Sequence, residues 1–347
     1  MKIINAIHAQ SIGGVDQVFR NYNQILVQNG HEVALLISDN GNDKYEIGGL
    51  KKIFKLKNSN QIFDFLNLLK IIFCFKPDII ICHSNRLMRW MKLVRVFNKI
   101  GLTKVKSVAV NHGITVKKSL HCDYIISINQ QISDLVVKAG FDANKSFILA
   151  NVIKVDQTYQ EKTPKLIPTI AIYGRIEPRK GFDILIKACG ILAQRNHDFK
   201  LKIGGFEVPG SYNWQTIEEL TKAQNIFDKC EFFGVVIDKK SFFKDVDIFC
   251  VPSREEPFGL VILEGFLNST LVISSDTDGG KLLIKNRENG LLFTNENSEE
   301  LAEKIIEASS EVSFYQAITK KAFAKLEKEF SFDLLNQEIL KILQKIT

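Results

Sequence analysis

The segment Val251–Gly265, which reads VPSREEPFGLVILEG, says the most about how this chain folds. The apolar run Asp247–Val251 is typical of a buried strand, and the apolar residues that follow the segment's acids are typical of a helix. Because proline favours the first turn of a helix, Pro257–Gly259 predicts where this helix begins. The free backbone N–H groups and the dipole of a helix start bind anions. The segment therefore predicts a strand, a loop and a helix with an anion site at the loop.

Two acidic residues flank this predicted anion site. Glu256 stands just before it, and Glu264 lies eight residues further on. That spacing corresponds to roughly 12 Å at about 1.5 Å per helical residue. In line along the segment, the first carboxylate matches the hydroxyls of a sugar, the anion site matches a diphosphate, and the second carboxylate matches the hydroxyls of a ribose. The segment therefore predicts a nucleotide-sugar as ligand.

Length and composition limit the class of protein. The chain has 347 residues, 45% of them apolar, which is enough for two packed domains. It has no run of about 18 uninterrupted apolar residues and no signal-peptide pattern, which argues against a membrane-spanning helix and against export. Its six cysteines form no CxxC pair and lie mostly in apolar runs, which favours free buried thiols. We therefore expect a cytoplasmic protein.

The net charge of +7 is unevenly distributed. Residues 1–165 carry 23 Lys and Arg against 12 Asp and Glu, whereas the remainder carries 23 against 27. A basic first half favours anionic partners such as acidic lipids, phosphorylated acceptors or nucleic acid. We expect no nucleic-acid partner, because the chain shows neither interleaved aromatic and basic residues nor a known nucleic-acid motif.

The first half alternates short apolar runs with stretches of helical periodicity. Nearly continuous apolar runs are typical of parallel strands that are covered on both faces, so the alternation predicts a doubly wound α/β sheet. The predicted strands are Lys2–His8, His31–Ser38, Asp78–His83, Lys106–Asn111 and Tyr124–Ile128, and the predicted helices are Val15–Asn29, Gln61–Phe75, Asn85–Lys99 and Gln130–Ala139.

A polar segment with two prolines, residues 151–168, interrupts this pattern, and a second α/β series follows it. We predict strands Thr169–Arg175, Phe199–Gly204, Cys230–Gly234, Asp247–Val251 and Leu271–Ser274, a helix Phe182–Ala193, and helices after Asn295 with Ser298 and Ser331 as N-caps.

These two series predict two Rossmann-like domains that face each other across a cleft. We expect an N-terminal domain over residues 1–155, a C-terminal domain over 166–330, and a helix over 331–347 that packs back toward the first domain. Ligands of such sheets bind beyond the carboxyl ends of the strands.

Several residues at predicted strand ends are candidates for this binding region. Gly13 and Gly14 lie between the first strand and the first helix, where paired glycines allow a phosphate or sugar to approach the backbone or simply form a flexible turn. No GxGxxG is present, which argues against a nicotinamide or flavin dehydrogenase. His112 follows another strand and precedes Gly113, and it reads either as structural or as part of the site.

The run Tyr173–Gly181, YGRIEPRKG, follows the first strand of the second half. Arg175 and Lys180 at a strand end suit the neutralisation of a diphosphate, with arginine as a bidentate donor and lysine as a point charge. The alternative is a solvated basic loop, and the position at a strand end favours the diphosphate.

A basic amphipathic helix is predicted over residues 85–99. Such a helix with a tryptophan at its edge can lie on an anionic membrane. It can equally pack on a sheet with a solvated basic face, and both interpretations stay open. The basic residues are Arg86, Arg89, Lys92, Arg95 and Lys99.

With these residues in view, the chain resembles the retaining glycosyltransferases of the GT-B fold, in the large family numbered 4. The pattern G-R-x-x-x-x-K-G matches Gly174, Arg175, Lys180 and Gly181. The pattern P-S-x-x-E-P-F-G with a second acid matches residues 252–259 and Glu264. The chain departs from the family after Gly279-Gly280, where Lys281 follows in a region that usually carries an acid.

The resemblance implies a role for each matching residue. Arg175 and Lys180 would hold the donor diphosphate, Glu256 would contact hydroxyls of the donor sugar, and Glu264 would bind the ribose. His112 would lie beside the reacting sugar and complete a catalytic set with Glu256, Arg175 and Lys180. The further donor-binding positions would be Gly13, Gly14, Val235, Phe258, Gly259 and Leu260, with Val235 in the segment that borders the base.

The resemblance also implies the reaction. A UDP- or GDP-linked sugar would pass, with retention, to a cell-surface glycan or lipid-linked acceptor of the lipopolysaccharide or capsule type. The acceptor would attack the front face, and the leaving diphosphate would take its proton. Fixed cations and dipoles would stabilise the leaving group, so we expect no cofactor and no metal requirement.

Two other functions stay open on the sequence alone. A nucleotide-sugar epimerase or hydrolase can share this fold, and a non-catalytic protein could use the basic helix to bind a membrane surface. If the basic helix binds a membrane, we expect a peripheral protein on the inner face of the cytoplasmic membrane.

Overall fold

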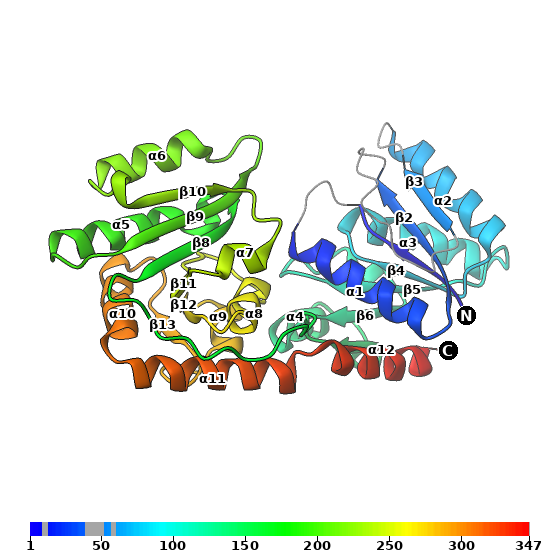
Figure 1. The fold of residues 1–347 in the computed structure, drawn as a ribbon. Coiled ribbons are helices and arrows are strands. Elements are labelled where there is room, and N and C mark those ends of the chain that lie inside the picture. Colours follow the sequence, from blue (N-terminus) through cyan, green and yellow to red (C-terminus); the bar gives the residue numbers. More distant parts are fainter. Residues whose placement is uncertain (9–12, 39–51, 57–59, 347) are drawn as a thin grey trace. The chain divides into compact units, whose positions relative to one another are not determined.

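The computed structural model describes residues 1–8, 13–38, 52–56 and 60–346 and divides the chain into two compact α/β units (Figure 1). Unit 1 contains Met1–Val152 together with the C-terminal helix α12 (Phe332–Ile346), and unit 2 contains Ile153–Ser331. Each unit has a parallel sheet with helices packed against it, so the predicted α/β fold class is confirmed.

The sheet of unit 1 has the strand order β3-β2-β1-β4-β5-β6-β7, and all its pairs are parallel. The order changes direction at β1, so the carboxyl ends of β1, β4 and β5 border the point where ligands of such sheets bind. The strands are β1 (Lys2–Ala6), β2 (Glu32–Ser38), β3 (Lys52–Leu56), β4 (Ile79–Cys82), β5 (Lys106–Asn111), β6 (Tyr124–Ser127) and β7 (Ser146–Ile148).

The helices of unit 1 connect these strands and cover the sheet. Hydrogen bonds join helix α12 to unit 1: Lys106 Nζ donates to Ile346 O at 2.6 Å, and Asn29 Nδ2 donates to Asn336 Oδ1 at 2.7 Å. The other helices are α1 (Gly14–Gln28), α2 (Gln61–Phe75), α3 (Asn85–Lys99) and α4 (Gln130–Lys138), with the 3₁₀ turns η1 (Ser119–His121) and η2 (Ala143–Lys145).

The sheet of unit 2 has the order β10-β9-β8-β11-β12-β13, again with parallel pairs. Its strands are β8 (Thr169–Ile176), β9 (Lys200–Glu207), β10 (Cys230–Gly234), β11 (Ile248–Val251), β12 (Leu271–Ser275) and β13 (Leu291–Phe293). Its helices are α5 (Phe182–Gln194), α6 (Trp214–Ala223), α7 (Lys239–Phe243), α8 (Leu260–Leu267), α9 (Asp278–Leu283), α10 (Ser298–Ser310) and α11 (Val312–Glu329), with turns η3 (Pro178–Lys180) and η4 (Phe227–Lys229).

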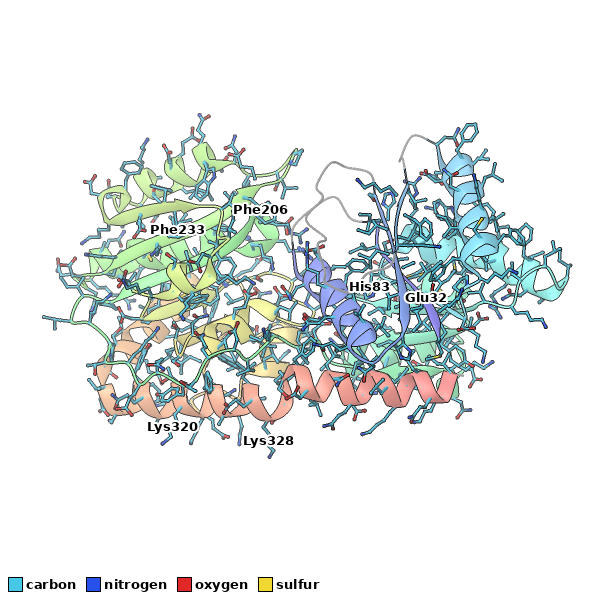
Figure 2. All side chains as sticks on the ribbon, turned by 45° about the vertical axis from the view of Figure 1, so that its right-hand side comes forward. Glu32, His83, Phe206, Phe233, Lys320 and Lys328 are labelled. Atoms are coloured by element: carbon cyan, nitrogen blue, oxygen red, sulfur yellow. The ribbon has the colours of Figure 1, made fainter. Side chains whose placement is uncertain are left out.

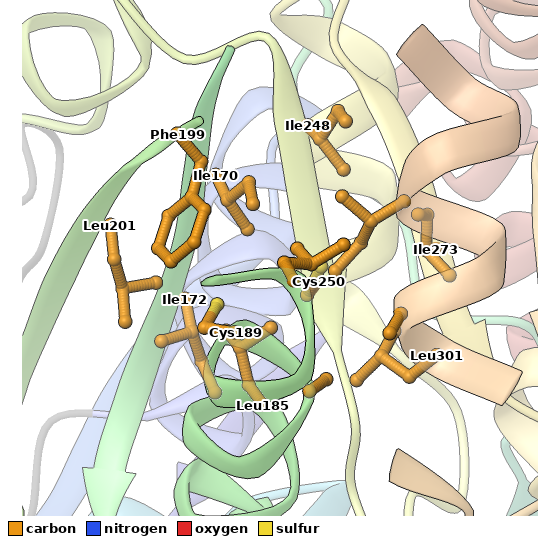
Figure 3. Close-up of a cluster of buried hydrophobic side chains, with 14 of the residues drawn as sticks. Ile170, Ile172, Leu185, Cys189, Phe199, Leu201, Ile248, Cys250, Ile273 and Leu301 are labelled. Atoms are coloured by element: carbon orange, nitrogen blue, oxygen red, sulfur yellow. The ribbon is translucent and has the colours of Figure 1, made fainter. Parts of the chain in front are cut away.

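The core of unit 2 lies between the sheet and helices α5 and α10 (Figure 3). Ile170 and Ile172 of β8 are buried against Leu185 of α5, and Leu301 of α10 closes the same cluster. The apolar runs that predict these strands therefore supply this core, and burial of the side chains is the main favourable contribution to folding.

The structure corrects several element boundaries. Helix α8 begins at Leu260, so the predicted start at Pro257 is wrong: Gly259 has a φ of 97° and forms the N-cap. Helix α10 is capped by Asn297, whose Oδ1 accepts from Glu300 N at 3.1 Å, so Ser298 is not the N-cap. Three short strands, β3, β7 and β13, are absent from the predicted elements. Within the described residues, no helix has the length and apolar character to cross a bilayer.

Candidate active site

Two neighbouring strands of unit 2 bring the predicted donor-binding residues together. Strands β8 and β11 pair in parallel, so their carboxyl ends lie at the same edge of the sheet. Arg175 lies near the end of β8, and Lys180 closes the turn η3 that follows. The segment after β11 carries Glu256 and leads into α8.

Glu256 holds this edge together through its two carboxylate oxygens. Lys180 Nζ donates to Glu256 Oε2 at 2.7 Å, and the backbone N–H of Gly259 donates to Glu256 Oε1 at 3.1 Å. The side chains of Lys180 and Glu256 are 16% and 12% exposed. The aliphatic stem of Lys180 crosses Gly174, whose hypothetical Cβ would lie 3.7 Å from Lys180 Cγ. The anion that occupies the start of α8 in this structure is therefore the protein's own Glu256.

Arg175 lies at the same strand end but pairs with a different acid. Its Nη2 is 3.1 Å from Glu177 Oε1, which Arg179 also contacts at 3.1 Å. The side chain of Arg175 is about one third exposed, more than that of Lys180. It is thus a cation at the edge of the site that can exchange a carboxylate for a phosphate.

Arg254 ties the two loops together, although no motif in the sequence points to it. Both of its terminal nitrogens contact the carboxylate of Asp183, at 2.9 and 2.8 Å, and Nη1 also donates to the carbonyl of Pro178. Burial raises the pKa of Asp183, but the hydrogen bonds and charge of Arg254 outweigh it and lower that pKa. This bidentate pair fixes the loop after β8 against the loop after β11.

Two glycines allow this close packing. Gly181 has a φ of 70°, and a Cβ on it would lie 1.9 Å from the carbonyl oxygen of Pro252. A Cβ on Gly279 would lie 2.6 Å from Glu256 O, to which Gly279 N donates at 2.7 Å. The backbone around Glu256 is therefore enclosed on two sides, and neither position leaves room for a side chain.

Glu264 lies one turn into α8 and is buried, with 8% of its side chain exposed. Burial raises its pKa to about 8. Its Oε1 contacts Lys239 Nζ at the start of α7, a partner that was not predicted from the sequence. The second oxygen, Oε2, has no hydrogen-bond partner among the described residues. A buried acceptor without a partner is costly, so Oε2 is available to a ligand that donates hydrogen bonds.

The other predicted donor-binding positions of unit 2 surround this edge. The side chain of Phe258 is buried and packs edge-on against Phe330 with ring centroids 6.1 Å apart, so only its backbone can serve a ligand. Leu260 is the first residue of α8. Val235 follows the end of β10 and is about half exposed.

In unit 1, His112 follows β5 and contacts His83, which follows β4. Nε2 of His112 is 3.1 Å from Nδ1 of His83, and the two rings stack with centroids 5.3 Å apart. His83, labelled in Figure 2, also meets the rings of Phe19 and Tyr22 of α1 edge-on. Burial lowers the pKa of His112 to about 4, and burial together with His112 lowers the pKa of His83. Both imidazoles are therefore neutral at pH 7.

A second polar cluster adjoins β1 and β4. Arg86 Nη1 lies 2.7 Å from His8 Nε2, and Arg86 Nη2 donates to Asp64 Oδ2 at 2.6 Å. Asp64 is 1% exposed, and its Oδ1 has no partner among the described residues. In the sequence His8 reads as structural, and neither His83 nor Asp64 stands in a functional motif. The sheet order brings His8 and His83 together because β1 and β4 are neighbours, whereas Asp64 reaches Arg86 from α2.

The remaining predictions in unit 1 concern Gly13, Gly14 and α3. Gly13 is the N-cap of α1 in an extended conformation, and a Cβ on it would meet none of the described residues within 4 Å. On α3, Arg86 points into the polar cluster, whereas four basic residues are exposed: Arg89, Lys92, Arg95 and Lys99.

The chain has two parallel α/β units, and in unit 2 the loop after β8 with Lys180 meets the loop after β11 with Glu256 at one edge of the sheet. This combination defines the GT-B class. Residues 156–325 match the family model described as Glycosyl transferases group 1, and residues 12–157 match the model Glycosyltransferase Family 4. The chain is a glycosyltransferase of the GT-B fold.

Known proteins resemble the chain over its full length. The lipopolysaccharide core biosynthesis glycosyltransferase LpsE of Rhizobium meliloti is 24% identical, with 99% of each chain covered. The structure of Anabaena HepE in complex with UDP and glucose superposes with a TM-score of 0.85 at 17% identity and covers 99% of both chains. The apo form of the lipopolysaccharide outer core galactosyltransferase WaaB gives 0.77 at 18% identity and covers 100% of both. At these identities the structural likeness establishes the fold.

The close approach of Gly181 to Pro252 predicts a large loss of stability in Gly181→Ala. The left-handed φ and the 1.9 Å approach act together, so we expect a loss of about 2 to 4 kcal/mol in the free energy of unfolding. Trp214 fluorescence in a Trp90→Phe background reports urea unfolding of unit 2. Gly174→Ala is the matched control, because its new Cβ makes only ordinary contacts. Equal midpoints for the two variants would show that Gly181 is not needed for the close approach to Pro252.

The neutral histidines His83 and His112 predict that unit 1 loses stability in acid. The pKa of His112 is lowered, so below about pH 6.5 the unfolded chain takes up protons that the folded chain refuses until about pH 4. We expect His112 alone to cost about 1 kcal/mol between pH 7.5 and pH 5.5. Trp90 fluorescence in a Trp214→Phe background measures this. His112→Gln should reduce the slope and the exposed control His197→Gln should keep it; an unchanged slope in both would refute the assignment.

Proposed function

We propose that this glycosyltransferase moves a sugar, with retention of configuration, from a UDP- or GDP-linked donor to a glycan or lipid-linked acceptor of the cell surface. The observation that carries the donor half is the joined set Lys180, Glu256 and Gly259 with Glu264 on the same helix. It combines a cation, a helix start and two carboxylates at one strand edge, which matches the diphosphate, sugar and ribose of a nucleotide-sugar.

Each predicted site residue of unit 2 then has a defined role in donor binding. Arg175 and Lys180 bind the diphosphate, and Glu256 turns its carboxylate to the hydroxyls of the donor sugar. The buried Glu264, with Oε2 lacking a partner, accepts hydrogen bonds from the ribose. Phe258, Gly259 and Leu260 offer backbone groups beside the sugar and phosphate, and the half-exposed Val235 borders the base.

The charges of the site suit stabilisation of the leaving group. As the glycosidic bond to the nucleoside diphosphate breaks, negative charge grows on the departing phosphate oxygen. Arg175, Lys180 and the start of α8 are fixed before the reaction, so they stabilise that charge without reorganisation. The departing oxygen takes the proton of the attacking acceptor hydroxyl. Because fixed protein cations provide this neutralisation, we propose that turnover needs no added divalent metal.

We assign the neutral His112 to hydrogen bonding near the reacting sugar. A pKa of about 4 leaves the imidazole uncharged at working pH, and His83 fixes its orientation through Nε2. Gly13 and Gly14, at the start of α1, present backbone to a phosphate or sugar. A neutral imidazole orients a hydroxyl without adding charge to an oxocarbenium-like sugar.

Two comparisons support the choice of substrates. HepE is described in complex with UDP and glucose, which favours a UDP-linked hexose. LpsE and WaaB are named for lipopolysaccharide synthesis, which favours an acceptor of the lipopolysaccharide or related surface-glycan type.

Loss of either site charge should strongly lower turnover. We expect Arg175→Ala and Glu256→Ala to lower kcat/KM by about 10²-fold or more, the range seen when one transition-state donor is removed. A thermal-shift screen of nucleotide-sugars first identifies the donor, and release of its nucleoside diphosphate then measures the rate. Lys187→Ala, an exposed lysine on α5, is the control. Near-normal rates in both site variants would overturn the proposed donor site.

We also propose that the enzyme is cytoplasmic and binds the anionic inner face of the membrane through α3 and its neighbour α2. The helices contact each other where Arg86 meets Asp64 and where Phe65 meets Trp90 at 6.0 Å. Asp64 is the single acid on either helix, and it is buried.

The exposed faces of these helices are both basic and apolar. On α2, Ile62 and Phe63 are 68% and 64% exposed, and on α3 the apolar residues lie between exposed lysines and arginines. Large exposed apolar side chains with a basic rim are the features of an interfacial helix pair. The exposed apolar residues are Ile62, Phe63, Leu66 and Phe73 of α2 and Leu93 and Val96 of α3, with Ile100 and Leu102 just beyond it.

Co-sedimentation with vesicles tests this surface. The wild-type protein should bind phosphatidylcholine vesicles that contain phosphatidylglycerol, and added salt should weaken the binding. Phe63→Ser with Leu66→Ser should weaken binding by about tenfold or more, because two inserted apolar side chains are lost. Val137→Ser, an exposed apolar site on α4, is the control. Equal binding by the double variant and wild type would exclude this face.

A further inference from the structure

The contact between Lys239 and Glu264 joins two elements that lie 25 residues apart in the sequence. Lys239 begins α7, shortly after Val235, and Glu264 lies on α8. Lys239 Nζ donates to Glu264 Oε1, while Glu264 Oε2 is buried without a partner among the described residues. The side chain of Lys239 is 41% exposed and that of Glu264 is 8% exposed. One carboxylate oxygen is thus held from the solvent side, and the other is left for a ligand.

The surroundings of Glu264 contain no second ion-pair partner in the part of the chain that the structure describes. Strand β12 brings no charged side chain, and β11 brings the buried thiol of Cys250. Helix α9 carries Asp278 and Lys281, and none of the charged side chains of α11 pairs with Glu264. Those of α11 are Lys320, Lys321, Lys325, Glu327, Lys328 and Glu329, beside the phenol of Tyr315. Lys239 is therefore the cation that acts directly on this carboxyl.

We propose that Lys239 is a positioning residue that keeps Glu264 ionised and fixes its orientation for the ribose of the donor nucleotide. The inference rests on the donor site proposed above. A ribose presents two neighbouring hydroxyl donors, and a carboxylate can accept both, because each oxygen has two lone pairs. Lys239 occupies one lone pair of Oε1, which leaves Oε2 and the remaining lone pair of Oε1 for the diol.

Protonation of Glu264 would remove this arrangement. Burial raises the pKa of Glu264 because the charged form is poorly solvated there, and the ammonium of Lys239 in contact with Oε1 opposes that rise, so loss of this cation would favour the protonated form. A protonated carboxyl loses acceptor capacity and turns one oxygen into a donor. Lys239 favours the charged form by direct contact, although burial also lowers the pKa of Lys239 itself. Removal of Lys239 should therefore weaken ribose binding at low and neutral pH, and alkaline pH should restore it.

Titration calorimetry with the full-length protein tests this inference. The ligands are UDP or GDP, whichever wild type binds, and its 2′-deoxy and 3′-deoxy analogues, each at pH 6.5, 7.5 and 9.0. Lys239→Met should bind the ribonucleotide about tenfold to a hundredfold more weakly at pH 6.5, the range for a hydrogen bond to a charged group. At pH 9.0 its affinity should return to within about threefold of wild type. At pH 6.5 its preference for the ribonucleotide over the deoxy analogues should also disappear.

Three further variants separate positioning from a structural role. Lys239→Arg keeps the cation and should keep the wild-type pH profile, whereas Glu264→Gln should bind weakly at every pH. Lys240→Met removes the adjacent lysine, which has no contact with Glu264 in the described structure, and should match wild type. Loss of affinity in Lys239→Met that is equal at all three pH values and for all analogues would overturn the inference and indicate a structural role.

Two more outcomes are decisive. Wild-type affinity and wild-type ribose preference in Lys239→Met would also overturn the inference, while the donor site itself would stand. If the wild-type protein binds neither UDP nor GDP at any pH, the proposed donor site fails first.

Discussion

The carboxylate of Glu256, shared between the ammonium of Lys180 and the backbone N–H of Gly259, is the interaction on which the candidate site of unit 2 depends. It joins the loop after β8 to the loop after β11 at the point where two parallel strands end side by side. Much of the nearby structure serves this contact. The stem of Lys180 packs over Gly174, and Gly181 and Gly279 let backbone segments pass at distances that exclude any side chain. The site is therefore ordered before a donor arrives, which is the condition for stabilising charge in a transition state without reorganisation.

Four acids at this edge of unit 2 each contact a cation, and the pairs differ in how readily a ligand can replace one partner. Arg254 and Asp183 form a bidentate pair whose task is to fix the loops. The contact between Arg175 and Glu177 is more exposed, so a phosphate can replace the carboxylate at little cost. The Glu264 carboxyl is the most buried, and its second oxygen lacks a partner among the described residues, so its full hydrogen bonding needs a ligand. The same kind of acid–cation pair thus either fixes the loops or stays available to a ligand, depending on how deeply the pair is buried and on whether all its oxygens have partners.

The sequence allowed the fold class and most elements to be predicted, because their signals are local. Helices α2 and α3 have the predicted bounds, since the helical periodicity lies within each segment. Strand β3, KIFKL, reads as polar because it lies at the sheet edge, and β7 and β13 have only three residues each. The start of α8 was misplaced because the left-handed Gly259, not Pro257, fixes it. Motif residues such as Glu256 and Glu264 were visible, whereas the supporting contacts of Arg254 with Asp183 and of Lys239 with Glu264 were not, because those contacts span 71 and 25 residues and carry no spacing signal.

The distribution of charge separates the tasks of the two units. The first half of the chain is the basic half, yet its strand-end clusters are kept close to neutral: His83 and His112 are uncharged, and Arg86 is matched by Asp64. Four of its exposed cations lie on α3: Arg89, Lys92, Arg95 and Lys99. Unit 2 has the lower net charge and nevertheless holds Arg175 and Lys180 where a diphosphate would need them. The excess of basic residues in the first half of the chain therefore does not indicate where the donor site lies. Because charge on a surface acts over about a Debye length while charge in a site acts by contact, the bias points to a large anionic partner and the motif to a small one.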